Sequence, residues 1–223
     1  MKDSAYKDLV TRILKTSLPN VGYAGSISYV VAVSGAAALG KTEFCKKLKG
    51  YFEEKNYSTI HIELDGYLKS RKERVSEKIS GYDPNATRFT NLINDLSQLL
   101  KGGKPTNIPY YDHKLGKITK TIKAIPQAVV ILDGIVALHY EIRNNFPGYN
   151  IFLSADDITM KGFRIDVDIN ERRYNIFDAL RHIESESKEY DRWIHHQSEF
   201  ADARISVLKN RNKRIRFNKK TSN

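Results

Sequence analysis

The sequence predicts an α/β fold in which a mostly parallel sheet lies between helices on both faces. Five short apolar runs, each rich in Ile, Val or aromatic residues, are typical of strands buried on both sides. They span 26–34, 58–64, 128–133, 149–154 and 203–207. Helical patterns occupy segments between them, and such alternation favours a parallel sheet because each parallel connection needs a crossover.

The helical segments follow in order along the chain. Near the N-terminus, residues 6–18 carry an apolar stripe, and we expect this helix to pack on the sheet. A second helix follows the first strand directly, at 41–55. A third, over 88–103, has apolar residues at helical spacing and ends at two glycines. A long fourth helix is expected over 170–196.

The size and charge of the chain set its organisation. The 223 residues suffice for one sizeable core, so we expect a single domain over 1–208. The formal net charge is +11, and residues 209–223 contribute seven basic side chains and no acidic one. We therefore expect 209–223 to be a solvated or flexible basic tail, where any contact with nucleic acid would be made.

Composition excludes several classes of protein. No apolar run approaches 18 residues, so no membrane span is expected, and the N-terminus lacks the apolar segment of a secretory signal. Cys45 is the single cysteine, which rules out an internal disulfide and fits a reducing, cytoplasmic setting. We expect its thiol to be buried by packing rather than used in chemistry.

A phosphate-binding loop joins the first strand to the second helix. The stretch GAAALGKT matches G-x-x-x-x-G-K-[ST], a pattern whose glycines let successive backbone N–H groups point at phosphate oxygens. Its residues are Gly35, Ala36, Ala37, Ala38, Leu39, Gly40, Lys41 and Thr42. In such a loop the lysine reaches the β- and γ-phosphates of ATP and the threonine hydroxyl ligates Mg²⁺. The pattern predicts a P-loop NTPase-type three-layer fold.

Two aspartates come at the ends of predicted strands. Asp65 follows the second strand and Asp133 ends the third, so both belong to the sheet edge where open α/β folds bind ligands. A carboxylate at this edge can accept the proton of an attacking hydroxyl, which we expect of Asp65. Asp133 could hold Mg²⁺ directly or through water.

The order of these motifs resembles the uridine kinase and phosphoribulokinase family of P-loop kinases. Besides the phosphate loop, six looser segments resemble motifs of that family in the family's order: ELDGYLKSR, SGYDPNATRF, LLKGGKPTNIPYYDHKLGKIT, ILDGIVALH, FRIDVDINER and EFADARISV. The resemblance covers about residues 28–208. It implies an ATP-dependent kinase that phosphorylates a hydroxyl of a small molecule, and a small helical lid at about 160–178.

The resemblance also implies roles for individual residues. Lys41, Asp65 and two lid arginines, Arg164 and Arg172, match catalytic positions, with Asp65 as general base. Thr42 and Asp133 match the metal-binding positions. Four further residues match positions that line the acceptor pocket: Tyr67, Asp83, Tyr111 and Asp112.

Departures from the family pattern leave alternatives open. The middle lid arginine is replaced by Val167, for which Arg173 or Arg181 could substitute, and Asp133 stands where the family usually has Glu. A nucleoside, a pentose phosphate or a similar metabolite all fit as acceptor. One alternative is a nucleotide-binding regulatory module without turnover; another is an RNA-associated protein that uses the basic tail. The sequence leaves open whether the chain forms a homo-oligomer, although dimers and tetramers are common among relatives.

Overall fold

The computed structural model describes residues 1–17, 28–101, 103–170 and 173–218. Within these residues, the centre is a six-stranded sheet with the order β2-β5-β1-β6-β7-β8. Its strands are β1 (Tyr29–Gly35), β2 (Thr59–Glu63), β5 (Val129–Asp133), β6 (Gly148–Ser154), β7 (Ala203–Val207) and β8 (Lys213–Phe217). All run parallel except β8, which pairs antiparallel with β7. The predicted α/β fold with a mostly parallel sheet is confirmed.

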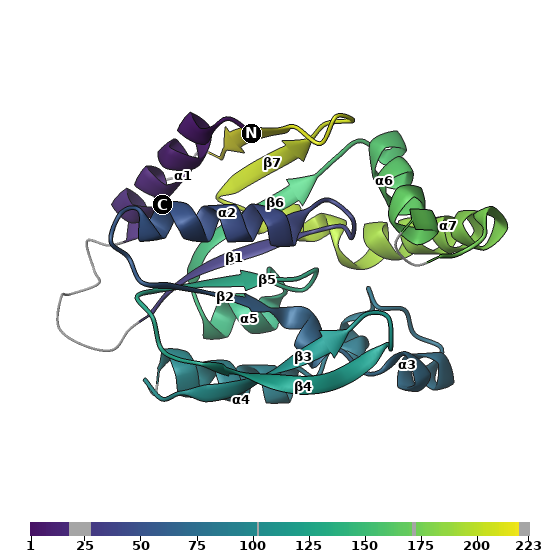
Figure 1. Cartoon of the computed structure of the whole chain (residues 1–223), viewed down its shortest axis with the longest axis horizontal. Coiled ribbons are helices and arrows are strands. Elements are labelled where there is room, and N and C mark those ends of the chain that lie inside the picture. Colours follow the sequence, from purple (N-terminus) through teal and green to yellow (C-terminus); the bar gives the residue numbers. More distant parts are fainter. Residues whose placement is uncertain (18–27, 102, 171–172, 219–223) are drawn as a thin grey trace.

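Helices lie against both faces of this sheet. α1 (Asp3–Ser17) and α2 (Lys41–Glu53) cover one face, whereas α5 (Tyr140–Asn145) lies against the other (Figure 1). The 3-10 segment η3 (His195–Phe200) contacts β1 and β6. Every residue of β5 and all but the first of β1 are buried, as their uninterrupted apolar runs predict. The N-terminal stripe packs as expected, because Leu9 and Ile13 of α1 are fully buried in the main core.

A hairpin beside β2 was not predicted. β3 (Thr106–Asp112) and β4 (Lys117–Ala124) pair antiparallel and pack with α4 (Phe89–Leu100), while α3 (Arg71–Glu77) lies nearby (Figure 1). β4 has the sequence KITKTIKA, in which only two isoleucines and an alanine are apolar, so its strand signal is weak, and only its last residue is buried. The turn of this hairpin carries a histidine of the candidate site.

Two helices lie beyond the carboxyl ends of the parallel strands. They are α6 (Asp157–Asn170) and α7 (Ile176–Trp193), and Figure 1 shows both at the end of the sheet where β6 and β7 terminate. The expected lid over 160–178 falls on α6 and the first turn of α7, with residues 171–172 outside the described part. α7 begins later than the expected 170 because Asn175 caps it, its side-chain oxygen accepting a hydrogen bond from the backbone N–H of Asp178 at 2.9 Å.

The expectation of a solvated tail from residue 209 is wrong for Lys213–Phe217. These residues form β8 and close the sheet at one edge. Ile215 and Phe217 pack on the core, while Arg214 and Arg216 are exposed. Burial therefore alternates along the segment, as in a strand with one solvent-exposed face. Charged side chains on an edge strand also discourage pairing with another chain.

The predicted burial of Cys45 is confirmed. Cys45 is fully buried in α2, and burial raises the pKa of its thiol well above the ordinary value. Among the described residues, every helix is too short or too polar to cross a membrane.

Candidate active site

The phosphate loop lies between β1 and α2, at the carboxyl edge of the sheet. Gly35 adopts φ 143°, and a Cβ there would lie 2.2 Å from the carbonyl oxygen of Leu153 in β6. Gly40 caps α2 with φ 70°, in the left-handed region. Ala38 also has a positive φ, 62°, which costs an L-residue about 1–2 kcal/mol. The alanines of the loop are thus compatible with its turn, although one of them is strained.

A cleft of about 430 Å³ opens over this loop. The loop contributes Lys41 and Thr42 to it, and the ends of β2 and β5 contribute Asp65 and Asp133. The Lys41 ammonium folds back and donates a hydrogen bond to the carbonyl oxygen of Ala36 at 3.0 Å. We expected these four side chains at one edge of the sheet, and they line one cleft there.

Asp133 connects the cleft to the interior of the sheet. Its Oδ2 accepts a hydrogen bond from the Thr42 hydroxyl at 2.7 Å and lies 3.2 Å from Nε2 of His61 on β2. Only 3% of Asp133 is exposed. A hydroxyl and a carboxylate side by side are oxygen ligands of the kind that Mg²⁺ prefers, so these two residues fit the ion that the motif implies.

Asp65 follows β2 directly, in the 3-10 segment η1 (Leu64–Tyr67). Its Oδ2 lies 3.3 Å from Nε2 of His113 in the β3–β4 turn, and a third of its side chain is exposed to the cleft. Loss of hydration would raise the pKa of Asp65, but the hydrogen bond from His113 and the charges of His113, Lys41 and Arg74 outweigh it, so the pKa is lowered. Asp65 is therefore a carboxylate at neutral pH, as a proton acceptor must be.

The four residues expected around the acceptor have other contacts. The Tyr67 hydroxyl donates to Asp95 at 3.1 Å, and its ring is buried. Asp83 and Asp112 cap turns by accepting backbone N–H bonds. Tyr111 accepts a hydrogen bond from Arg74 at 3.0 Å. In the described part of the chain none of the four lines the 430 Å³ cleft, and their role in acceptor binding stays a prediction.

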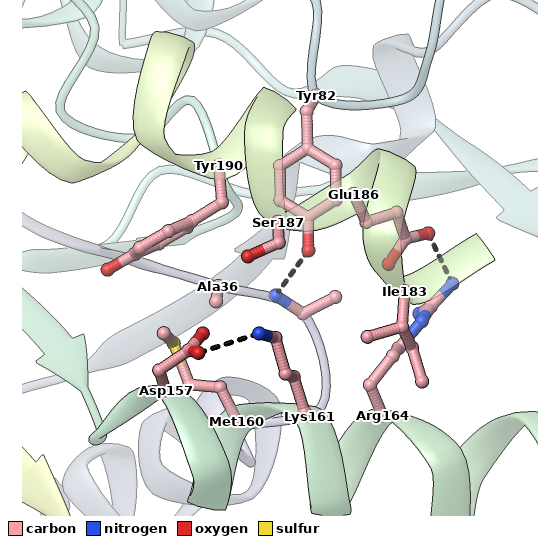
Figure 2. A pocket seen from close by; sticks show the side chains of 11 residues that line it. Ala36, Tyr82, Asp157, Met160, Lys161, Arg164, Ile183, Glu186, Ser187 and Tyr190 are labelled. Carbon is pink, nitrogen blue, oxygen red and sulfur yellow. Dashed lines mark hydrogen bonds and ion pairs between the residues drawn. The ribbon is translucent and has the colours of Figure 1, made fainter. Parts of the chain in front are cut away.

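The lid arginines are placed differently from each other. Arg164 of α6 is buried, pairs with Glu186 of α7 at 2.5 Å and lies 3.3 Å from Asp168. Figure 2 shows it at the side of a small pocket of about 40 Å³, between α6 and α7. Arg172 lies outside the described residues. Val167, which replaces the middle arginine of the family pattern, lines the cleft itself.

Arg211 is a residue of the cleft that sequence reasoning missed. It lies in the β7–β8 turn and lines the cleft together with Val167. Its guanidinium donates to Asp166 of α6 at 2.8 Å and stacks 4.3 Å above the ring of Phe163. Because the seven basic residues from 209 onward suggested a free tail, the return of the chain to the phosphate loop was not predicted.

Two more contacts on the loop were also missed. The backbone N–H of Ala37 donates to the hydroxyl of Tyr82 at 3.1 Å, a bond that Figure 2 shows. Lys213 of β8 is half-buried beside Gly40, and loss of hydration lowers its pKa. Tyr82 belongs to the segment SGYDPNATRF, yet only the fold shows where its ring points.

Comparison with known proteins identifies the family of the chain. A model described as the phosphoribulokinase/uridine kinase family matches residues 30–213. The phosphoribulokinase of Synechocystis sp. is 26% identical over 182 residues, which cover 82% of this chain and 54% of that protein. The uridine kinase of Streptococcus agalactiae is 28% identical over 178 residues, covering 78% of this chain and 84% of that protein. The chain thus spans about half the length of the phosphoribulokinase that it matches.

Solved structures share the fold. A D-glycerate 3-kinase from Cryptococcus neoformans superposes with a TM-score of 0.70 at 12% identity, covering 96% of this chain and 99% of that one. The phosphoribulokinase from Rhodobacter spheroides gives 0.63 at 13% identity, covering 87% and 81%. Kinases of the matched family use ATP, generally with Mg²⁺. Since the family model covers most of the residues, the chain belongs to the phosphoribulokinase/uridine kinase family of P-loop kinases.

Proposed function

We propose that this chain is an ATP-dependent kinase that transfers the γ-phosphoryl group to a hydroxyl of a nucleoside, a sugar phosphate or a similar small metabolite. One observation carries the proposal: the Asp65 carboxylate opens into the same cleft as the phosphate-loop residues Lys41 and Thr42. A phosphate cradle alone would serve many nucleotide-binding proteins. A depressed-pKa carboxylate beside it provides the acceptor for a hydroxyl proton.

The proposed reaction divides into binding and proton transfer. Backbone N–H groups of the phosphate loop, apart from that of Ala37, which donates to Tyr82, hold the phosphates, and the Lys41 ammonium helps to balance their charge. The acceptor oxygen forms a bond to the γ-phosphorus while the bond to the ADP oxygen breaks, and the acceptor proton passes to Asp65. Thr42 and Asp133 would hold Mg²⁺, which supplies charge neutralisation at the phosphates.

The acceptor side of the cleft lies toward the β3–β4 turn. His113 lies there, and Tyr111 and Asp112 precede it in the chain, so we retain these two as acceptor-binding candidates. Tyr67 and Asp83 could take part only by exchanging their present hydrogen bonds for the acceptor. Arg164 could likewise act on the transferring phosphate only by leaving Glu186, and Arg172 keeps the lid role that the family pattern implies.

The cysteine content and the C-terminal strand bear on the compartment and the partner of the enzyme. We place the enzyme in the cytoplasm, since a single buried cysteine suits a reducing setting. We propose a small-molecule partner rather than a nucleic acid, because part of the basic C-terminal segment pairs within the sheet.

The proposal is tested by ADP release from Mg-ATP in the presence of uridine, other nucleosides, pentose phosphates, D-glycerate or pantothenate. An acceptor that stimulates ADP release establishes the kinase and names its substrate. ATP binding without stimulation by any of them would instead favour a nucleotide-binding regulatory module, which the replacement of a lid arginine by Val167 makes the second candidate.

Removal of His113 should shift the acid limb of the pH–activity profile upward. The His113→Asn change takes away the hydrogen bond and the positive charge that lower the pKa of Asp65, so this pKa should rise. A base must be deprotonated to act, so activity in kcat/KM should then be lost at a higher pH than in wild type. The exposed His196, changed to Asn, is the control. An unmoved acid limb in His113→Asn would contradict the assignment of Asp65.

Arg211 should contribute to turnover although it lies outside the family's lid pattern. Arg211→Ala is expected to lower kcat/KM about 10- to 100-fold, the usual worth of a hydrogen bond to a charged group. Arg214→Ala removes an exposed arginine from the adjacent strand and should change little. Steady-state kinetics of both variants make the comparison, and equal effects would show that general surface charge, not the position of Arg211, matters.

A further inference from the structure

Three metal-ligating side chains of different chemistry meet between α2 and the sheet. Cys45 comes from α2, His61 from β2 and Asp133 from the end of β5. The thiol sulfur, an imidazole nitrogen and a carboxylate oxygen all lie within 4.8 Å of one another. Cys45 is fully buried, Asp133 is 3% exposed and the His61 side chain is 9% exposed. Packing alone does not require a thiol, an imidazole and a carboxylate at one point.

The spacing of these atoms suits one small cation. A point between three atoms that are at most 4.8 Å apart lies about 2.8 Å or less from each, close to Zn–ligand distances of about 2.0–2.3 Å. His61 Nε2 and Asp133 Oδ2 are 3.2 Å apart. This is about the separation of two ligands around a tetrahedral zinc ion, so His61 and Asp133 are already spaced as two ligands of one ion.

We propose that Cys45, His61 and Asp133 form a binding site for a thiophilic divalent cation of the Zn²⁺ class. Thiolate and imidazole ligands favour such ions, whereas Mg²⁺ takes oxygen ligands. Asp133 lines the cleft, which gives the ion its route of entry. Binding displaces the thiol proton, as with any cysteine ligand.

The site bears on the proposed kinase activity through one shared atom. Asp133 Oδ2 is the atom that accepts the Thr42 hydrogen bond and faces His61. An ion bound by Cys45 and His61 would also bind this carboxylate oxygen, which would then no longer be placed beside Thr42 to bind Mg²⁺. Thiophilic cations should therefore oppose Mg²⁺-dependent turnover. This consequence rests on the proposed function, whereas binding of the cation does not.

A Co²⁺ titration of the full chain without Mg²⁺ tests the site directly. The chain has a single cysteine, so a thiolate-to-cobalt charge-transfer band in the near ultraviolet can come only from Cys45. We expect this band to saturate at one equivalent, with visible bands of four-coordinate cobalt, and to disappear on addition of Zn²⁺. Absence of the charge-transfer band would overturn the proposal, whatever the activity of the protein.

Variants separate binding from its consequence. Cys45→Ala and His61→Gln should each lower the affinity for Zn²⁺ at least tenfold, measured by competition with a chromophoric chelator. The control variant His196→Asn should leave this affinity unchanged. Thermal unfolding in EDTA identifies any variant that fails to fold. The cobalt spectrum of the wild-type protein tests the site even if a variant does not fold. Zn²⁺ should inhibit wild type more than either variant, each relative to its own zinc-free rate. A cobalt band without inhibition by Zn²⁺ would support the metal site and overturn its predicted effect on turnover. Absence of turnover with every acceptor would refute the proposed function and leave the metal site unaffected.

Discussion

Asp65→Asn is expected to lower kcat by about 10²- to 10⁴-fold, the range that a positioned general base contributes. Asparagine keeps the size of the side chain and one oxygen that can accept from His113, but it cannot take a proton. The affinity for ATP should stay within about threefold, since Asp65 meets the acceptor rather than the phosphate loop in the proposed mechanism. Steady-state kcat and a direct nucleotide-binding titration measure the two effects separately.

The control for this change is Asp191→Asn, which removes a carboxylate that is 70% exposed on α7. It should leave both kcat and ATP affinity unchanged, because it lies in solvent. Equal losses of kcat and ATP affinity in Asp65→Asn would mean that the residue supports the cleft as a whole. Asp65 would then not be the base.

The fold, the phosphate loop and the two aspartates of the cleft could be predicted from the sequence. Their signals are either local or follow from the geometry of parallel strands. A strand, a glycine-bounded loop and a helix in sequence define the phosphate site within residues 29–53. Asp65 and Asp133 needed one more rule, that the carboxyl ends of parallel strands share an edge. The register confirms it, since Asp133 pairs with Val33 of β1 and Glu63 of β2.

The directions in which the side chains around Asp65 point could not be predicted from the sequence. Tyr67 comes two residues after Asp65, but the 3-10 turn of η1 directs its ring into the core and its hydroxyl to Asp95. His113 reaches Asp65 because a hairpin that is mostly solvent-exposed folds over the end of β2. Such pairings depend on contacts between distant segments, for which a single sequence carries no periodic signal.

The C-terminal segment shows how composition can obscure structure. Seven basic residues suggested a tail, yet KRIRF also alternates charged and apolar side chains with the period of a strand. Pairing with β7 then fixes the turn that delivers Arg211 to the cleft. Net charge outweighed alternation in the prediction, although both patterns are present in the same residues.

Lys41→Ala should lower kcat/KM by at least about 10²-fold, because it removes a positive charge from the phosphates in a site where charge stabilisation dominates phosphoryl transfer. Folding should be little affected: the Lys41 side chain donates a hydrogen bond to the carbonyl oxygen of Ala36, and alanine is a good helix former at the start of α2. The matched control is Lys47→Ala, on the exposed side of the same helix, where a single ion pair to Glu43 is lost. Steady-state kinetics and thermal unfolding of both variants check the prediction. If Lys41→Ala kept activity comparable with that of Lys47→Ala while folding normally, the Lys41 ammonium would not stabilise the transferring phosphoryl group, and the backbone N–H groups of the loop and the metal ion would have to balance that charge without it.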